Sequence, residues 1–333
     1  MATLTLGCKL NQAESQSMGR ALVSAGCDVI DRPVAADAYL INTCTVTHVA
    51  DRKARRLIRM AKRLSPEAPV VVTGCYADWA SERIAAETGA DLVLSNREKG
   101  EAVAGVLARL GAARGVGESS GPGQLHEGRS RAFLKIQEGC DDVCAFCIVP
   151  GVRGRERAVP IDAIVAEAQA MERAGAQEVV LTGTQPGAYG RDRDDGTNAA
   201  GLIESLLTRT TLPRIRYSSI QPQDVSASFL EQWQDDRMCR HFHLALQSGS
   251  DAVLGRMRRR YDVAMFLGAL ERIRAAVPGA AVTTDVIVGF PGEGEAEFAE
   301  SVSASEQGGF ARMHLFPSSA RPRTGAALME DDV

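Results

Sequence analysis

The stretch Glu138-Gly139-Cys140-Asp141-Asp142-Val143-Cys144-Ala145-Phe146-Cys147 holds three cysteines in C-x3-C-x2-C spacing. Three thiolates on one short loop can bind three irons of a cubane iron–sulfur cluster, in which a fourth cysteine would normally close the last site. The fourth iron then stays open to another ligand. The alternative is a zinc knot, but the sequence has no fourth cysteine or histidine near enough to complete a tetrahedral site. The loop therefore predicts an iron–sulfur cluster with an open coordination position.

Length and composition are those of an ordinary globular protein. The chain has 333 residues, which favours two domains, and it is 45% hydrophobic and 24% charged. No apolar run approaches the roughly 20 residues of a membrane helix, and the first residues lack the layout of a secretory signal, so we expect no membrane partner and a cytoplasmic location. Eight cysteines are too few for a disulfide scaffold, and their clustering favours metal ligation in a reducing compartment.

The first hundred residues predict a parallel sheet with cysteines at one edge. Strand-like runs at 3–6, 38–41 and 70–73 alternate with helical segments at 12–25 and 47–64. Cys8, Cys44 and Cys75 each follow a strand, and parallel strands end at one edge of a sheet. The pattern predicts a shared metal site, where helix N-termini would lower the thiol pKa values. The alternative is three buried free thiols, which is how we interpret the isolated Cys27 and Cys239.

The rest of the chain predicts a linker and a second α/β domain. Residues 113–128 are rich in Gly and Ser and have no periodicity. Strands are predicted at 132–136, 179–182, 215–218, 242–246, 282–288 and 313–316, with helices at 161–173, 199–207, 263–276 and 295–306. About six strands with parallel crossovers predict an incomplete barrel with a ligand at its C-terminal mouth. The predicted domains are 1–112 and 129–333.

Longer motifs resemble a known family. The segments around Cys8, Cys44 and Cys75 resemble the N-terminal domain of the radical S-adenosylmethionine (SAM) methylthiotransferases, and Leu246–Asp251 and Thr284–Glu293 resemble their catalytic domain. The resemblance runs over nearly the whole chain and implies a Rossmann- or flavodoxin-like domain followed by a partial (β/α)6 TIM-like barrel. It implies two 4Fe-4S clusters and SAM as cofactors. Cys8, Cys44 and Cys75 would hold an auxiliary cluster, and the catalytic Cys140, Cys144 and Cys147 the radical-generating one.

The turns after the barrel strands predict the SAM pocket. Each turn offers hydroxyl, amide or flexible backbone groups to a polar ligand, although turn formation or helix capping explains any one of them alone. The predicted cofactor-binding residues in these turns are Thr182, Gly183, Ser218, Gln247, Ser248, Gly289 and Phe290. Gln221 stands where the family more often has Glu before proline, so a charged SAM contact is not expected there.

Within the family, the motifs most resemble the enzymes that insert a methylthio group at C2 of N6-threonylcarbamoyladenosine next to the tRNA anticodon. Isopentenyladenosine tRNA and a ribosomal protein are alternative substrates, and a non-catalytic iron–sulfur RNA-binding protein is the alternative class. Implied partners are the tRNA anticodon stem-loop, an electron donor such as flavodoxin or ferredoxin, and a sulfur donor. Because the net charge is −4, RNA contacts would need local basic patches. The candidate patches are Arg52, Arg55, Arg56, Arg59 and Arg63; Arg153, Arg155 and Arg157; and Arg256, Arg258, Arg259 and Arg260. The C-terminal RNA-binding β-barrel domain of the family is expected to be absent from this chain.

Overall fold

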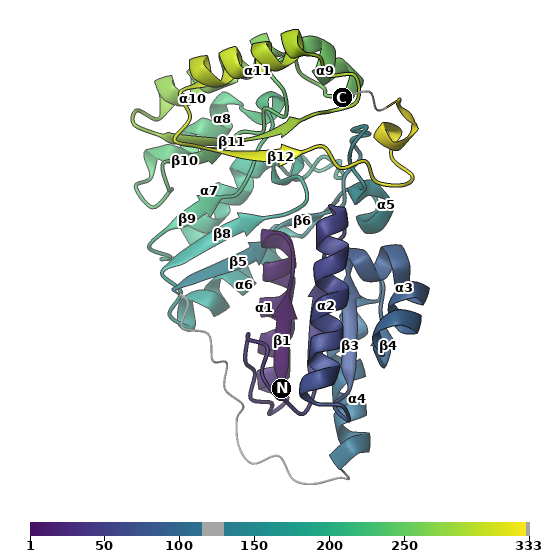
Figure 1. The fold of residues 1–333 in the computed structure, drawn as a ribbon. Coiled ribbons are helices and arrows are strands. Elements are labelled where there is room, and N and C mark those ends of the chain that lie inside the picture. Colours follow the sequence, from purple (N-terminus) through teal and green to yellow (C-terminus); the bar gives the residue numbers. More distant parts are fainter. Residues whose placement is uncertain (115–129, 331–333) are drawn as a thin grey trace. The chain divides into compact units, whose positions relative to one another are not determined.

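The computed structural model describes residues 1–114 and 130–330, so the predicted linker 113–128 lies almost wholly outside the described residues (Figure 1). The chain divides into two compact units. The first comprises residues 1–129 together with Gly151–Arg153, and the second comprises 130–150 and 154–333. The inclusion of Gly151–Arg153 in the first unit is a feature that the sequence did not predict.

The first unit is a four-stranded parallel sheet flanked by helices. Its elements are β1 Ala2–Thr5, α1 Lys9–Ser24, β2 Tyr39–Thr43, α2 His48–Leu64, β3 Val70–Gly74, α3 Cys75–Thr88, β4 Leu92–Val93, a 3-10 turn η1 at Lys99–Glu101, and α4 Ala102–Arg114. The sheet order is β1-β2-β3-β4, and every pair is parallel. The α/β class predicted for this half is therefore observed, with α1 beginning three residues earlier than predicted.

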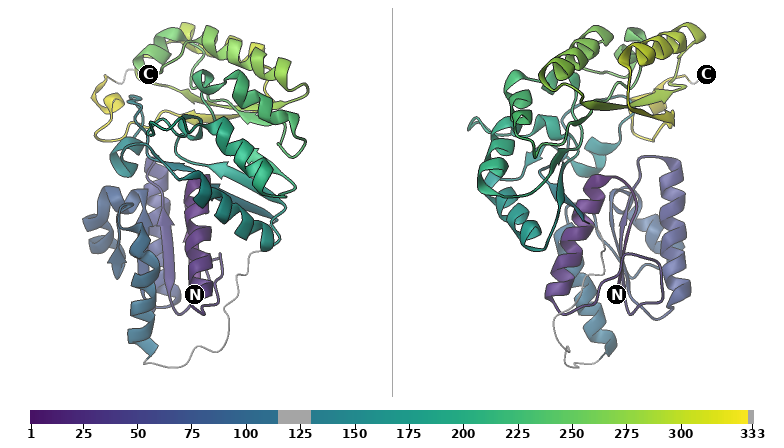
Figure 2. Two further views of the ribbon diagram at one scale, coloured as in Figure 1. Left: turned by 180° about the vertical axis from the view of Figure 1, so that it is seen from behind. Right: turned by 90° about the vertical axis from the view of Figure 1, so that its left-hand side faces the viewer.

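The sheet changes winding direction beside β1. After α1 the chain forms a parallel bridge from Ile30 to Ala2 on the outer side of β1, and it then crosses to β2 on the other side. This reversal places α1 and α2 on opposite faces of the sheet, as the right-hand view of Figure 2 shows. It also makes the C-terminal ends of β1 and β2 a topological switch point, where open α/β sheets bind ligands.

Each face of the sheet has its own apolar core. Ala54, Ile58 and Ala61 of α2 recur at helical spacing and pack on one face. Leu22 of α1 and Val106 of α4 pack on the other. The α2 helix begins at His48, one residue after the predicted start, because Thr47 is its N-cap and its hydroxyl accepts a hydrogen bond from the Ala50 amide at 3.2 Å. Burial of both faces makes this sheet a fixed platform for the residues at its edge.

The second unit contains six parallel strands in two three-stranded sheets of order β5-β8-β9 and β10-β11-β12. A bridge between Ile220 and Leu244 joins the two sheets. Together the two sheets form the incomplete barrel expected from the sequence. Its strands are β5 Arg131–Lys135, β6 Gln137–Glu138, β7 Arg157–Ala158, β8 Glu178–Thr182, β9 Ile215–Tyr217, β10 His241–His243, β11 Ala281–Val288 and β12 Arg312–Pro317. Its helices are α5 Val149–Arg153, whose last three residues belong to the first unit, α6 Ile161–Arg173, α7 Ala199–Arg209, α8 Ala227–Glu231, α9 Asp251–Arg256, α10 Val263–Ala276 and α11 Glu295–Gly308.

Alternation along β11 separates the helix side of this sheet from the open side. Val282, Thr284 and Val286 are buried, whereas Thr283 and Asp285 are half-buried. Because successive strand residues point to opposite faces, the second set lies on the face without helices. Among the described residues, no helix is long and apolar enough to cross a membrane.

Candidate metal and cofactor centres

The structure brings the first cysteine triad to one edge of the sheet of the first unit. Cys8 precedes the first residue of α1, Cys44 follows the last residue of β2, and Cys75 is the first residue of α3. Cys44 interacts electrostatically with both other thiols. Gly7 has a φ of 118°, and a Cβ there would lie 2.9 Å from Cys44 Cβ, so the Gly7-Cys8 turn approaches Cys44 closely.

The predicted lowering of the thiol pKa is wrong for Cys44. Burial raises the pKa of the Cys44 thiol to about 11, and the hydrogen bond with the Val46 backbone offsets only part of this rise. The helix N-termini do not compensate, because a thiolate loses its hydration when it is buried. In the metal-free protein this thiol is therefore neutral at pH 7, and metal binding must displace its proton.

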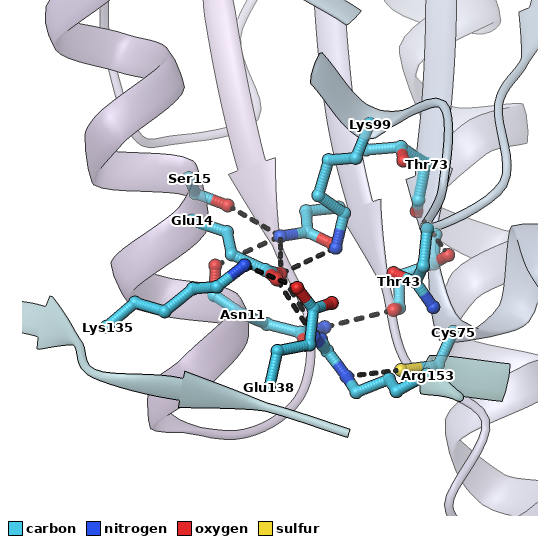
Figure 3. A network of polar contacts seen from close by, with 12 residues as sticks. Asn11, Glu14, Ser15, Thr43, Thr73, Cys75, Lys99, Lys135, Glu138 and Arg153 are labelled. Carbon is cyan, nitrogen blue, oxygen red and sulfur yellow. Dashed lines mark hydrogen bonds and ion pairs between the residues drawn. The ribbon is translucent and has the colours of Figure 1, made fainter. Parts of the chain in front are cut away.

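A polar network reaches Cys75 of the first triad (Figure 3). The Asn11 side chain donates to the backbone oxygens of Leu6 at 2.8 Å and Thr43 at 2.9 Å, which joins the turns after β1 and β2. Glu14 accepts hydrogen bonds from Lys99 at 2.5 Å and from Arg153 Nη1 at 2.8 Å. Sequence analysis gave no role to Asn11, Glu14 and Lys99, and it assigned Arg153 to RNA binding instead. The polar positions of α1 on its buried side, Asn11 and Glu14, were the available signal.

Backbone hydrogen bonds hold the second triad on its loop in the second unit. The Ala145 amide donates to Met257 O at 2.9 Å, and the Ala326 amide donates to Ala145 O at 2.7 Å. Burial raises the pKa of Cys140 to about 12 and of Cys147 to about 11. Both thiols interact electrostatically with Cys144, so the three sulfurs of the loop form one group.

Two side chains from other barrel elements contact these thiols. Cys140 Sγ donates to Gln185 Oε1 at 3.0 Å, and Arg259 Nη1 donates to Cys144 Sγ at 3.1 Å. Arg259 also donates to Gln221 at 3.0 Å, and Gln221 in turn donates to Asp142 at 3.0 Å. Gln221 is thus part of the support of the cysteine loop. The spacing of the cysteines gave no indication of these partners.

The predicted SAM-binding residues lie at the strand ends, but not all of them expose side chains. Ser248 is fully buried, and its hydroxyl is hydrogen-bonded with Ser301 of α11 at 3.1 Å. Phe290 is fully buried against Ala145. These two side chains support the fold, and only their backbone groups can face a ligand.

The other five predicted residues offer backbone and polar groups at the strand ends. Thr182 and Gly183 follow β8, and Ser218 follows β9 with its amide on Leu181 O at 3.1 Å. Gln247 has a φ of 66° and Gly289 a φ of 67°. The Gly289 amide donates to Glu293 at 2.6 Å, so Glu293 shapes this turn and was missed from the sequence.

The turn after β8 has the unpartnered polar atoms expected of a polar ligand site. Thr184 Oγ1 and Gln185 Nε2 are buried, and neither has a hydrogen-bond partner among the described residues. A buried polar atom without a partner is costly, and a bound ligand removes that cost. With three thiols and a guanidinium nearby, the donor set of this mouth fits an iron–sulfur cluster and a polar cofactor with an amino and a carboxylate group.

A second polar group lies on the open face of the barrel sheet. His243, Asp285 and His314, from three adjacent strands, present ligand-type atoms within 4.8 Å of one another. Asp285 pairs with His243 at 3.2 Å and His314 at 3.1 Å. Burial raises the pKa of Asp285, but the two histidines outweigh it and hold this pKa below its usual value. Sequence analysis missed this group, although polar residues at alternate strand positions were a usable signal.

The sequence matches two families with known descriptions. Residues 1–95 match "Uncharacterized protein family UPF0004", and residues 134–304 match the "Radical SAM superfamily". The chain is 41% identical to "Threonylcarbamoyladenosine tRNA methylthiotransferase MtaB" of Bacillus subtilis, over 100% of this chain and 77% of that protein. The chain belongs to the radical-SAM methylthiotransferases. As a member it is an enzyme that uses SAM and two 4Fe-4S clusters.

Two further similarities bear on substrate and fold. The chain is 33% identical to "tRNA-2-methylthio-N(6)-dimethylallyladenosine synthase" of Syntrophotalea carbinolica, over 99% of this chain and 78% of that protein. Among solved structures, the radical SAM methyltransferase TsrM from Kitasatospora setae matches with a TM-score of 0.69 at 14% identity, over 98% of this chain and 76% of that one. This structural likeness confirms the fold expected for a methylthiotransferase.

Proposed function

We propose that this methylthiotransferase inserts a methylthio group at C2 of N6-threonylcarbamoyladenosine next to the anticodon of tRNA. Two separate groups of three thiols carry the proposal, because the reaction needs a radical source and a sulfur donor. The substrate follows from the 41% identity to a relative that bears this name. The proposed domains are 1–112 for the auxiliary cluster and 129–333 for the radical chemistry.

The two triads have different tasks in this proposal. Cys140, Cys144 and Cys147 hold the radical cluster, and Cys8, Cys44 and Cys75 hold the auxiliary cluster. When bound, the clusters and SAM supply the 5′-deoxyadenosyl radical, the sulfur and the methyl group.

The chain itself orients these groups and excludes water. Arg259 and Gln185 fix the thiols of the cysteine loop, while the strand-end turns at Thr182, Gly183, Ser218, Gln247 and Gly289 bind SAM. Ser248 and Phe290 contribute backbone groups only.

The exposed arginines of α2 are the proposed contacts to the tRNA anticodon stem-loop. Arg52, Arg56 and Arg63 are exposed on this helix, and arginine pairs with phosphate and stacks on bases. Other predicted RNA contacts are engaged inside the protein. Arg153 is buried on Glu14, and Arg259 is held by Cys144 and Gln221, so neither is available to RNA.

Several remaining arginines are partly engaged as well. Arg55 donates to Tyr76, Arg256 pairs with Glu297 and Arg260 with Asp142. The arginines of these patches that are exposed remain proposed contacts to tRNA. We further propose a reductant such as flavodoxin or ferredoxin, a separate sulfur donor and a cytoplasmic location.

The test is mass spectrometry of digested tRNA after anaerobic reaction of the reconstituted chain with SAM and a reductant. tRNA that carries threonylcarbamoyladenosine but lacks the methylthio group is the substrate, and isopentenyladenosine tRNA and a ribosomal protein fraction are the comparisons. A gain of the methylthio mass on threonylcarbamoyladenosine supports the proposal. A gain only on isopentenyladenosine or on protein assigns one of the alternatives instead. Iron counting separates enzyme from binding protein, because about eight irons per chain are needed for two clusters.

A further inference from the structure

Arg153 is an almost fully buried arginine in the first unit. Its side chain is 3% exposed, and all three of its side-chain nitrogens have hydrogen-bond acceptors. Nη1 donates to Glu14 at 2.8 Å, Nη2 donates to Asn11 Oδ1 at 2.6 Å, and Nε donates to Cys75 Sγ at 3.3 Å (Figure 3). Burial of a guanidinium costs free energy unless its positive charge is paired and its N–H groups have hydrogen-bond acceptors.

The position of Nε is determined by the other two nitrogens. Glu14 and Asn11 accept hydrogen bonds from the two terminal nitrogens of the guanidinium. The Asn11 side chain in turn donates to the backbone oxygens of Leu6 and Thr43. Because the guanidinium is planar and rigid, fixing two nitrogens aims the third. The third nitrogen points at the sulfur of Cys75. A lysine ammonium has no such fork and would not be aimed in this way.

Two cations of this network meet at one carboxylate. Lys99 and Arg153 both pair with Glu14. A cubane core with two positive charges and three thiolates carries one net negative charge. The positive guanidinium beside Cys75 is therefore opposite in sign to the charge of a bound auxiliary cluster.

We propose that Arg153 is a positioning residue of the auxiliary cluster. Its guanidinium donates a hydrogen bond to the Cys75 thiolate and so makes the cluster easier to reduce. This inference rests on the proposed assignment of Cys8, Cys44 and Cys75 as its ligands. A hydrogen bond and a positive charge at a ligating sulfur stabilise the extra electron of the reduced cluster, so they raise the reduction potential. Glu14 acts in the opposite direction by adding a negative charge beside the guanidinium.

The test measures the potential of the auxiliary cluster alone, in the full chain with Cys140, Cys144 and Cys147 all changed to Ala. Midpoint potentials are determined by electron paramagnetic resonance during redox titration. Arg153→Met should lower the reduction equilibrium constant about tenfold, which corresponds to a shift of about −59 mV for one electron. Glu14→Gln should shift the potential upward, because Asn11 still holds the guanidinium. Arg155→Met is the control, since Arg155 is 87% exposed and should cause no shift.

The outcomes distinguish this inference from the proposed function. If the parent with three alanines assembles no 4Fe-4S cluster, the ligand assignment fails. If the parent assembles one and Arg153→Met leaves its potential unchanged, only the role of Arg153 is overturned. Shifts of the same sign in Arg153→Met and Glu14→Gln overturn the electrostatic account. If Arg153→Met does not retain the cluster, Arg153→Lys provides the test. A potential below that of the parent in Arg153→Lys supports the directed hydrogen bond from Arg153 to Cys75, and a potential equal to that of the parent overturns it.

Discussion

Cys8, Cys44 and Cys75 come from three strand ends that are far apart in sequence, whereas Cys140, Cys144 and Cys147 share one loop. The first triad depends on the register of a whole sheet, because Thr5 pairs with Asn42 and Thr43 with Gly74. The second depends on local spacing and on backbone hydrogen bonds from Ala145. The comparison teaches that equal sets of ligands can have unequal structural requirements, so the two triads should fail in different ways.

Loss of one cysteine from each triad should have the largest effect. Cys147→Ala should abolish SAM cleavage, because the radical cluster loses a ligand. Cys44→Ala should leave SAM cleavage but abolish sulfur insertion. Chromatography of 5′-deoxyadenosine and mass spectrometry of tRNA nucleosides measure the two activities. Equal loss of cleavage in both variants would contradict the division of tasks between the triads.

The Cys44 and Cys147 thiols of the metal-free chain should react slowly with iodoacetamide. Burial raises the pKa of Cys44 to about 11 from a model-compound value of 9.0, so at pH 8 its thiolate fraction is about 100-fold smaller than that of an ordinary thiol. Because the thiolate is the nucleophile and this pKa lies above pH 10, the rate of Cys44 alkylation should rise about tenfold per pH unit between pH 8 and 10. Cys147 should behave alike. Peptide mass spectrometry gives the rates, with the chain in urea as control. A rate for Cys44 that levels off near pH 9 in the folded chain would contradict the shift.

Substitution of one glycine beside each triad should show that the first triad depends on the sheet. Gly74 has a φ of 100°, and a Cβ there would collide with Thr43 O. Gly74→Ala should therefore destabilise the first unit by about 3 kcal/mol and reduce auxiliary iron. Gly139→Ala, whose Cβ would collide with Arg155 O, should instead disturb the cysteine loop of the second unit. Urea unfolding and iron counts measure these effects, and Gly100→Ala, which meets nothing within 4 Å, is the control.

Arg259 should have the smallest effect of this series. It donates to Cys144 Sγ at 3.1 Å without being a ligand, so Arg259→Met should slow SAM cleavage about tenfold while the cluster is retained. Arg258→Met is the matched control, because Arg258 is exposed. The rate of 5′-deoxyadenosine formation and the absorbance of the cluster are the measurements. Equal rates in the two variants would show that the loop holds its cluster without this arginine.

The sequence predicted those parts of the fold that leave a local pattern. The helices at Ile161–Arg173 and Val263–Ala276 were predicted to the residue, because apolar spacing and caps act within one element. The bridge from Ile30 beside β1 was not predicted, since it is a single pair set by the sheet. Both cysteine triads were predicted as metal ligands from spacing and strand ends, and this assignment stays a prediction.

The residues that support the cysteines could not be identified in this way. Arg153 was interpreted as an RNA contact, and its burial on Glu14 follows from a fold that brings together residues 139 positions apart. Asp285 and its two histidines lie on three different strands. Tertiary partners of this kind are visible only in the folded chain. The pKa of Cys44 was predicted in the wrong direction for the same reason, since burial depends on the whole core.

The membership of Gly151–Arg153 in the first unit has a consequence for synthesis on the ribosome. The N-terminal sheet can form as soon as β4 has emerged, and N-terminal domains generally fold first. Glu14, however, meets Arg153 only after Cys140, Cys144 and Cys147 have been translated. A nascent chain or an expressed fragment that stops at residue 129 would lack this arginine beside Cys75. In such a fragment a bound auxiliary cluster should be harder to reduce than in the full chain, so attempts to isolate the first unit should retain residues up to 153.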